Sequence, residues 1–90
     1  MTIDLQETLI ERGARYGRYA GLAAISQRIK AVLRDTPNWD TLADDQLETL
    51  EMTAHKMARI LNGDPDYADS WRDIAGYAMQ IANRLEGAGL

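Results

Sequence analysis

The chain has 90 residues, 46% of them hydrophobic, and a formal net charge of −4 at pH 7. The length corresponds to one domain covering residues 1–90, and the negative charge argues against general nucleic-acid binding. Because the chain contains no cysteine, disulfides, thiolate metal sites and a cysteine nucleophile are excluded.

The first half of the chain predicts two helices. Residues 5–14 favour a short helix, with Asp4 as its N-cap and with Gly13 and Gly17 marking its end. Residues 19–34 favour a second helix. Its apolar residues recur at helical spacing and predict one buried stripe, formed by Leu22, Ile25, Ile29, Val32 and Leu33.

The second half predicts two longer helices, over residues 44–62 and 68–86. Gly63 is expected to end the third helix in the left-handed conformation. Gly76, inside the fourth helix, is explained either by the close approach of a ligand or helix, or by simple tolerance. The predicted core stripes are Leu47, Leu50, Ala54, Met57 and Leu61 in the third helix, and Trp71, Ile74, Ala75, Ala78, Ile81, Ala82 and Leu85 in the fourth.

Four helices with short connections predict an all-α fold: a small four-helix, mostly antiparallel bundle that ends in a helical hairpin. A chain of this length buries only a modest core, so we also expect self-association into a homo-oligomer. The N-terminal residues include early acids and no long apolar run, which predicts neither a signal peptide nor a membrane span. These features favour the cytoplasm.

Charge is distributed unevenly along the chain. Residues 12–34 contain six basic residues and no acid, whereas residues 35–73 contain ten acids and three bases. One interpretation is that the two halves pair with each other, within one chain or between chains. The other is that the basic half holds an anion while the acidic half holds a metal ion.

Residues 12–19 combine three arginines and two tyrosines with two glycines. Arginine binds phosphate through a bidentate fork, and a tyrosine ring can stack on a nucleobase. We therefore expect Arg12, Arg15 and Tyr16 to bind a nucleotide-type ligand. In the alternative interpretation, the tyrosines pack the corner between the first two helices and the arginines face water.

Four carboxylates are candidate ligands for Mg²⁺, which prefers oxygen ligands and keeps waters for a phosphate. Glu48 and Glu51 lie on the third predicted helix, and Asp69 and Asp73 lie four residues apart on the fourth. Alternatively, these acids belong to solvated helix faces and form ion pairs worth about 0.3–0.5 kcal/mol each. His55, the only histidine, is more typical of a surface or hydrogen-bonding residue than of a metal ligand.

The predicted hairpin places its two helices side by side. We expect side chains from both helices to converge on one ligand pocket, with Tyr77 at its edge. The four expected to converge are Glu51, Lys56, Arg59 and Asp73.

Three stretches of the chain resemble a small uncharacterised family found in tailed phages and prophages. They are residues 9–17, with the motif ERGxRYG, and residues 50–66 and 69–78, which contain the motif NGDPDYxDSWxDIAGYA. The resemblance spans nearly the whole chain. It implies a phage-encoded protein that works in the bacterial host cytoplasm, and it assigns no activity.

The chain is also distantly similar to phage nucleotide-modification-associated domains and to MazG-like all-α NTP pyrophosphatases. That superfamily binds Mg²⁺ with a Glu-x-x-Glu pair on one helix and a Glu-x-x-Asp pair on a later helix. Glu48 and Glu51 match the first pair. In the second pair only Asp73 matches, because Ser70 stands where the glutamate should be and Asp69 is one residue out of register.

Three functions follow from these patterns. The first is capture of a nucleotide or nucleotide-derived ligand, including host immune signals, without hydrolysis. The second is a Mg²⁺-dependent nucleoside triphosphate pyrophosphohydrolase. The third is an interaction module with no small ligand. The residues expected to bind the ligand are Arg12, Arg15, Tyr16, Lys56, Arg59, Asp73 and Tyr77.

Overall fold

The computed structural model describes residues 2–87, and the side chains from residue 4 onward. No strand occurs within residues 2–87, so the predicted all-α fold is confirmed. A short 3₁₀ turn between the second and third helices was not predicted. The elements are α1 (Thr2–Tyr16), α2 (Tyr19–Arg34), η1 (Trp39–Thr41), α3 (Asp44–Asn62) and α4 (Ala68–Leu85).

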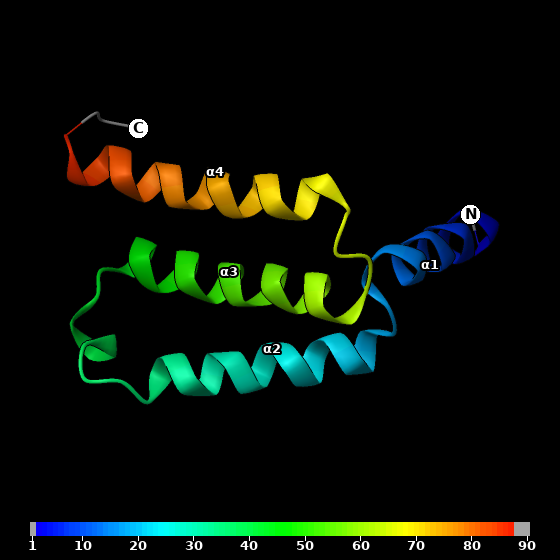
Figure 1. Cartoon of the computed structure of the whole chain (residues 1–90), viewed down its shortest axis with the longest axis horizontal. Coiled ribbons are helices and arrows are strands. Elements are labelled where there is room, and N and C mark those ends of the chain that lie inside the picture. Colours follow the sequence, from blue (N-terminus) through cyan, green and yellow to red (C-terminus); the bar gives the residue numbers. More distant parts are fainter. Residues whose placement is uncertain (1, 88–90) are drawn as a thin grey trace.

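Helices α2, α3 and α4 lie side by side in one layer, with α3 in the middle (Figure 1). Successive helices of this layer run in opposite directions, so the predicted hairpin of α3 and α4 is confirmed. Helix α1 leaves the layer at the end where α2 begins and α3 ends, and it extends away from it (Figure 1). The corner between α1 and the layer is where the candidate site lies.

An ion pair between Asp45 and Arg84 ties the first turn of α3 to the last turn of α4. Arg84 donates from Nε to Oδ2 of Asp45 at 2.6 Å and from Nη2 to Oδ1 at 2.7 Å. The hydrogen bonds from this guanidinium hold the pKa of Asp45 below its ordinary value of 3.8. This bidentate geometry is specific to one register of the hairpin but contributes only modestly, because both side chains are partly exposed.

Three predicted helix-end roles are wrong. Helix α1 begins at Thr2, so Asp4 lies inside the first turn and is not the N-cap, although a carboxylate there still favours the helix dipole. Gly63 has φ −133° and is not left-handed. Gly13 lies inside α1, which continues beyond the predicted end at residue 14, whereas Gly17 follows the helix as predicted, with φ +75°.

Few large side chains are buried in this layer. The buried hydrophobic residues of the described chain are Leu22, Ala54 and Ala58. The predicted core stripes are therefore wrong for their exposed members, which are Val32, Leu50, Met57, Leu61, Trp71, Ala75, Ala78, Ala82 and Leu85. In a layer one helix deep, only the flanks of each helix meet a neighbour, and an apolar stripe on an open face stays uncovered.

None of the helices within residues 2–87 has both the length and the apolar character that crossing a membrane requires.

Candidate functional site

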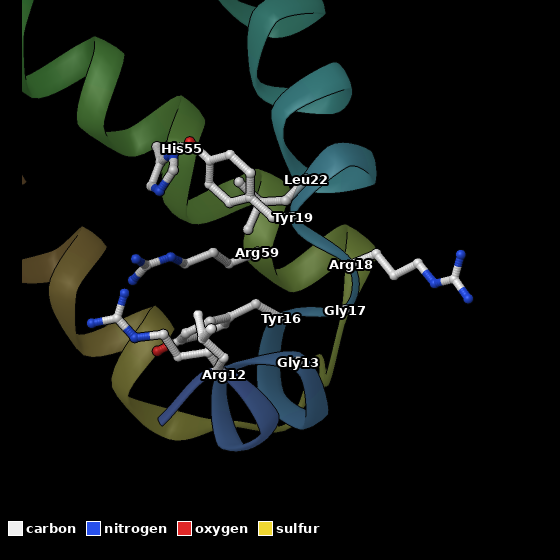
Figure 2. Close-up of a pocket in the computed structure, with 10 residues that line it drawn as sticks. Arg12, Gly13, Tyr16, Gly17, Arg18, Tyr19, Leu22, His55 and Arg59 are labelled. Atoms are coloured by element: carbon white, nitrogen blue, oxygen red, sulfur yellow. The ribbon is translucent and has the colours of Figure 1, made fainter. Parts of the chain in front are cut away.

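A pocket of about 370 Å³ lies in the corner between α1, the start of α2 and the second half of α3. Its floor is largely aromatic and aliphatic, and two arginines and a histidine stand at its rim (Figure 2). The residues that line it are Leu9, Arg12, Gly13, Tyr16, Gly17, Arg18, Tyr19, Leu22, His55 and Arg59.

Asn62, the last residue of α3, fixes the turn that forms one wall of the pocket. Its Nδ2 donates to the carbonyl oxygens of Tyr16 at 2.8 Å and of Arg18 at 2.9 Å. The backbone N–H of Asp64 donates to the carbonyl oxygen of Arg15 at 2.6 Å. The bonds to Arg15 and Tyr16 satisfy carbonyls of the last turn of α1, which have no partner within their own helix. The end of α1 is thereby held against the turn between α3 and α4.

The two turns approach each other so closely that only glycine fits at the contact. A Cβ on Gly63 would lie 2.2 Å from the carbonyl oxygen of Arg15 and 2.3 Å from Cα of Tyr16. A Cβ on Gly17 would lie 2.2 Å from the carbonyl oxygen of Asn62. These neighbours are backbone atoms, which cannot rotate away. Gly63 is therefore required for close approach, and not for the left-handed conformation that the sequence suggested.

Two adjoining tyrosine rings, each with an arginine stacked on it, lie beside the pocket. The Arg59 guanidinium carbon lies 4.3 Å from the centroid of the Tyr16 ring, and that of Arg15 lies 4.7 Å from the centroid of the Tyr67 ring. The two rings meet edge to face, with centroids 6.1 Å apart. Each cation–π contact is worth about 0.5–2 kcal/mol and orients the charged group. Tyr16 and Arg59 are thus held in place without any ligand.

Arg12 and Arg59 extend their guanidinium groups toward the same side of the pocket, whereas Arg18 points away from it (Figure 2). Neither Arg12 nor Arg59 forms a salt bridge with another described residue. The Nε atom of Arg59 is buried and has no hydrogen-bond partner among the described residues. Two cations without counterions at one rim create a local site for an anion.

His55 stands one helical turn before Arg59 on the same face of α3, beside Tyr19 (Figure 2). Burial of the imidazole, followed by the positive charges of Arg59, Lys30 and Lys56, lowers the pKa of His55 below its ordinary value of 6.5. The ring is therefore neutral at pH 7. The same positive field that disfavours the imidazolium favours a bound anion.

The structure divides the predicted ligand residues between separate places. Arg12, Tyr16 and Arg59 meet in the pocket, and Arg15 lies next to it on the Tyr67 ring. The other three lie where α3 and α4 meet. Lys56 of α3 pairs with Asp73 of α4, and Tyr77 of α4 lines a shallow groove.

The predicted convergence of Glu51, Lys56, Arg59 and Asp73 is not found within the described residues. Glu51 accepts from Arg34 of α2 at 2.7 Å, while Lys56 meets Asp73 of α4 at 3.0 Å. Residues five apart on a helix differ by about 140° in direction, so these side chains point to opposite neighbours.

The four carboxylates proposed as magnesium ligands also lie apart. Asp69 is bound by Tyr67 and Arg72, and Asp73 is held by Lys56. Glu48 lies in a groove beside α4, and Glu51 is turned toward α2. Within residues 2–87 no three carboxylate or histidine side chains gather as metal ligands.

The uneven charge distribution is only slightly relieved by pairing. Among the described residues, the pair of Arg34 and Glu51 is the one salt bridge that joins the basic segment 12–34 to the acidic segment 35–73. Within one chain, most of the basic segment therefore remains free to meet an anion.

His55 and Asn62 were not predicted to belong to the site, and Tyr19 was considered only as part of the segment 12–19. His55 and Arg59 are one turn apart on α3, a spacing visible in the sequence, so His55 was within reach of prediction. The role of Asn62 depends on its distant partners in the turn after α1, and local sequence carries no signal for it.

Comparison of the chain with protein-family models, curated proteins and solved structures gives no match. The resemblances to the phage family and to the MazG-like enzymes remain predictions. The chemistry of the pocket is therefore inferred from its own residues.

Proposed function

We propose that this protein binds a small phosphate-bearing ligand of the nucleotide type in the pocket between α1 and α3, and holds it without hydrolysis. The observation that carries this proposal is the pair of guanidinium groups of Arg12 and Arg59, which share one rim of an aromatic pocket and form no salt bridge with described residues. A ligand with a flat ring at one end and a phosphate at the other matches both features.

The size and lining of the pocket support such a ligand. Its volume of about 370 Å³ lies within the range of roughly 300–1,000 Å³ that is usual for small-molecule sites. Tyr16 and Tyr19 offer ring surface, and Leu9 and Leu22 add aliphatic surface. Such a floor favours a nucleobase over a purely ionic ligand.

The two arginines support an anion with several oxygens, such as a phosphate chain. The stacking of Arg59 on Tyr16 fixes the plane of its guanidinium. A preorganised guanidinium loses little entropy when it binds an anion. Arg12 stands on another helix, so the two can grip different oxygens of one phosphate chain.

Binding without hydrolysis is favoured over the pyrophosphohydrolase alternative by the placement of the acids. Hydrolysis assisted by Mg²⁺ needs carboxylates that converge beside the phosphate. Within one chain, Asp73 forms a salt bridge with Lys56, and Glu51 forms one with Arg34. A nucleotide ligand also agrees with a protein of the bacterial host cytoplasm, as the phage resemblance implies.

A thermal-shift panel tests the proposal. A nucleoside triphosphate at about 100 times its Kd is expected to add about 2.7 kcal/mol of stability, with no need for Mg²⁺ and with no release of pyrophosphate. The matching nucleoside without phosphate, and pyrophosphate alone, should each give a much smaller shift. If none of a broad set of nucleotides raises the Tm, the proposal is wrong. Mg²⁺-dependent pyrophosphate release that is lost in Asp73→Asn would instead support the hydrolase.

A further inference from the structure

The chain exposes more surface than a monomer of its size. Its accessible surface is 6516 Å² for a mass of 10.1 kDa, whereas a folded monomer of that mass exposes about 5,300 Å². Its radius of gyration is 15.3 Å, compared with about 12 Å for a compact chain of this length. The excess surface is therefore on the order of 1,200 Å².

One apolar face of the α3–α4 hairpin forms part of this exposed surface. Two adjoining hollows run along it and share Thr53 and Ile74. None of the described residues that line the two hollows is charged. The residues that line them are Leu42, Gln46, Thr49, Leu50, Thr53, Met57, Ile60, Leu61, Trp71, Ile74, Ala78 and Ile81.

This apolar face is separate from the cationic pocket. Met57 and Arg59 are two residues apart on α3, so their side chains differ by about 200° in direction. Met57 lies on the hairpin face and is 40% exposed, while Arg59 lines the pocket. A partner on the apolar face would therefore leave the pocket open.

Trp71 presents an exposed aromatic ring on this face. Its indole Nε1 donates to the carbonyl oxygen of Pro65 at 2.8 Å, so the one polar atom of the side chain is already satisfied. The ring is nevertheless 55% exposed. Leu61 beside it is 66% exposed. Contiguous apolar side chains that stay exposed in this way are typical of association sites.

We propose that a second copy of this chain covers the face, so that two α3–α4 hairpins pack against each other as an isologous dimer. Covering the whole excess of about 1,200 Å² on each chain would bury about 2,400 Å² in total, so the excess is large enough for a stable interface, which buries about 1,200–2,000 Å². A net charge of −4 on each chain opposes self-association in general, but the face itself carries no charge that would repel its copy. Thr53 and Ile74, at the junction of the two hollows, would lie near the twofold axis.

The solution mass tests this proposal independently of any ligand. Size-exclusion chromatography with light scattering, from low micromolar to several hundred micromolar protein, should give twice the chain mass of 10.1 kDa. Met57→Glu should weaken the dimer about 100-fold or more, because each interface would bury two unpaired carboxylates. The matched control Gln80→Glu, on the opposite side of α4, should remain dimeric.

Leu61→Glu provides a second variant in case Met57→Glu does not fold. Its side chain is 66% exposed in one chain, so the folded monomer tolerates a glutamate there, and its helical circular dichroism should match that of the parent. A parent protein that stays at the single-chain mass at every concentration would overturn the proposal and leave the face to a different partner. A dimer that survives both glutamates would also overturn it, because the chains would then meet elsewhere.

Discussion

Gly63→Ala is expected to lower the free energy of unfolding by about 3 kcal/mol and the Tm by about 10 °C or more. The new Cβ would overlap the carbonyl oxygen of Arg15 and Cα of Tyr16. Because both are backbone atoms, α1 must move away from the α3–α4 turn. That movement also strains the hydrogen bonds from Asn62 and Asp64 that hold the end of α1. Thermal and urea denaturation measure the effect.

Gly76→Ala is the matched control for this loss. A Cβ at Gly76 would meet nothing within 4 Å, so the close approach suggested by the sequence is not found among the described residues. In the interior of α4 the alanine should raise stability by about 0.5–1 kcal/mol. Equal stability of Gly63→Ala and the parent protein would contradict the close packing of α1 on this turn.

Arg59→Gln and Arg12→Gln are each expected to weaken binding of the best nucleotide from the thermal-shift panel by about 10- to 150-fold. Each change removes charge-assisted hydrogen bonds worth about 1.5–3 kcal/mol. The affinity for ligands with a phosphate should fall, whereas the affinity for the matching nucleoside should stay the same. Isothermal titration calorimetry gives the affinities, and circular dichroism confirms that the variants keep their helices.

Arg18→Gln controls for the change in total charge. Arg18 lies in the turn between α1 and α2, next to the pocket, but its side chain points away from the pocket (Figure 2). Its loss should change the affinity by less than about threefold, since an exposed charge at a distance is screened by salt. If Arg18→Gln weakens binding as much as Arg12→Gln, the attraction is a general field and not a built site.

Much of the fold could be predicted because helices have strong local signals. The third helix was predicted over residues 44–62, and the structure places α3 at Asp44–Asn62. The core could not be predicted equally well. Periodicity identifies the apolar stripe of a helix, but it does not say whether a neighbour covers that stripe. Met57 and Leu61 belong to the stripe and are nonetheless exposed in the single chain.

The candidate site could be predicted in part for a similar reason. Arg12 and Tyr16 stood out because they lie in one short segment rich in arginine and tyrosine, and Arg59 stood out by its place on a polar helix face. The expected partners of Arg59 were wrong, because the neighbour of its face is α1 and not α4. Asn62 and Gly63 act through contacts with α1, which the local sequence does not encode.

The central claim is that the corner between α1 and α3 is a cationic pocket that receives a phosphate. The most direct test uses His55, whose imidazole gives a single set of histidine signals in an NMR pH titration. Without ligand its pKa should lie below 6.5, because burial and the nearby cations disfavour the imidazolium. A saturating nucleotide should raise this pKa, since the bound phosphate stabilises the charged ring, and binding should tighten as the pH falls through the raised value. A His55 titration that the nucleotide leaves unchanged would contradict the claim.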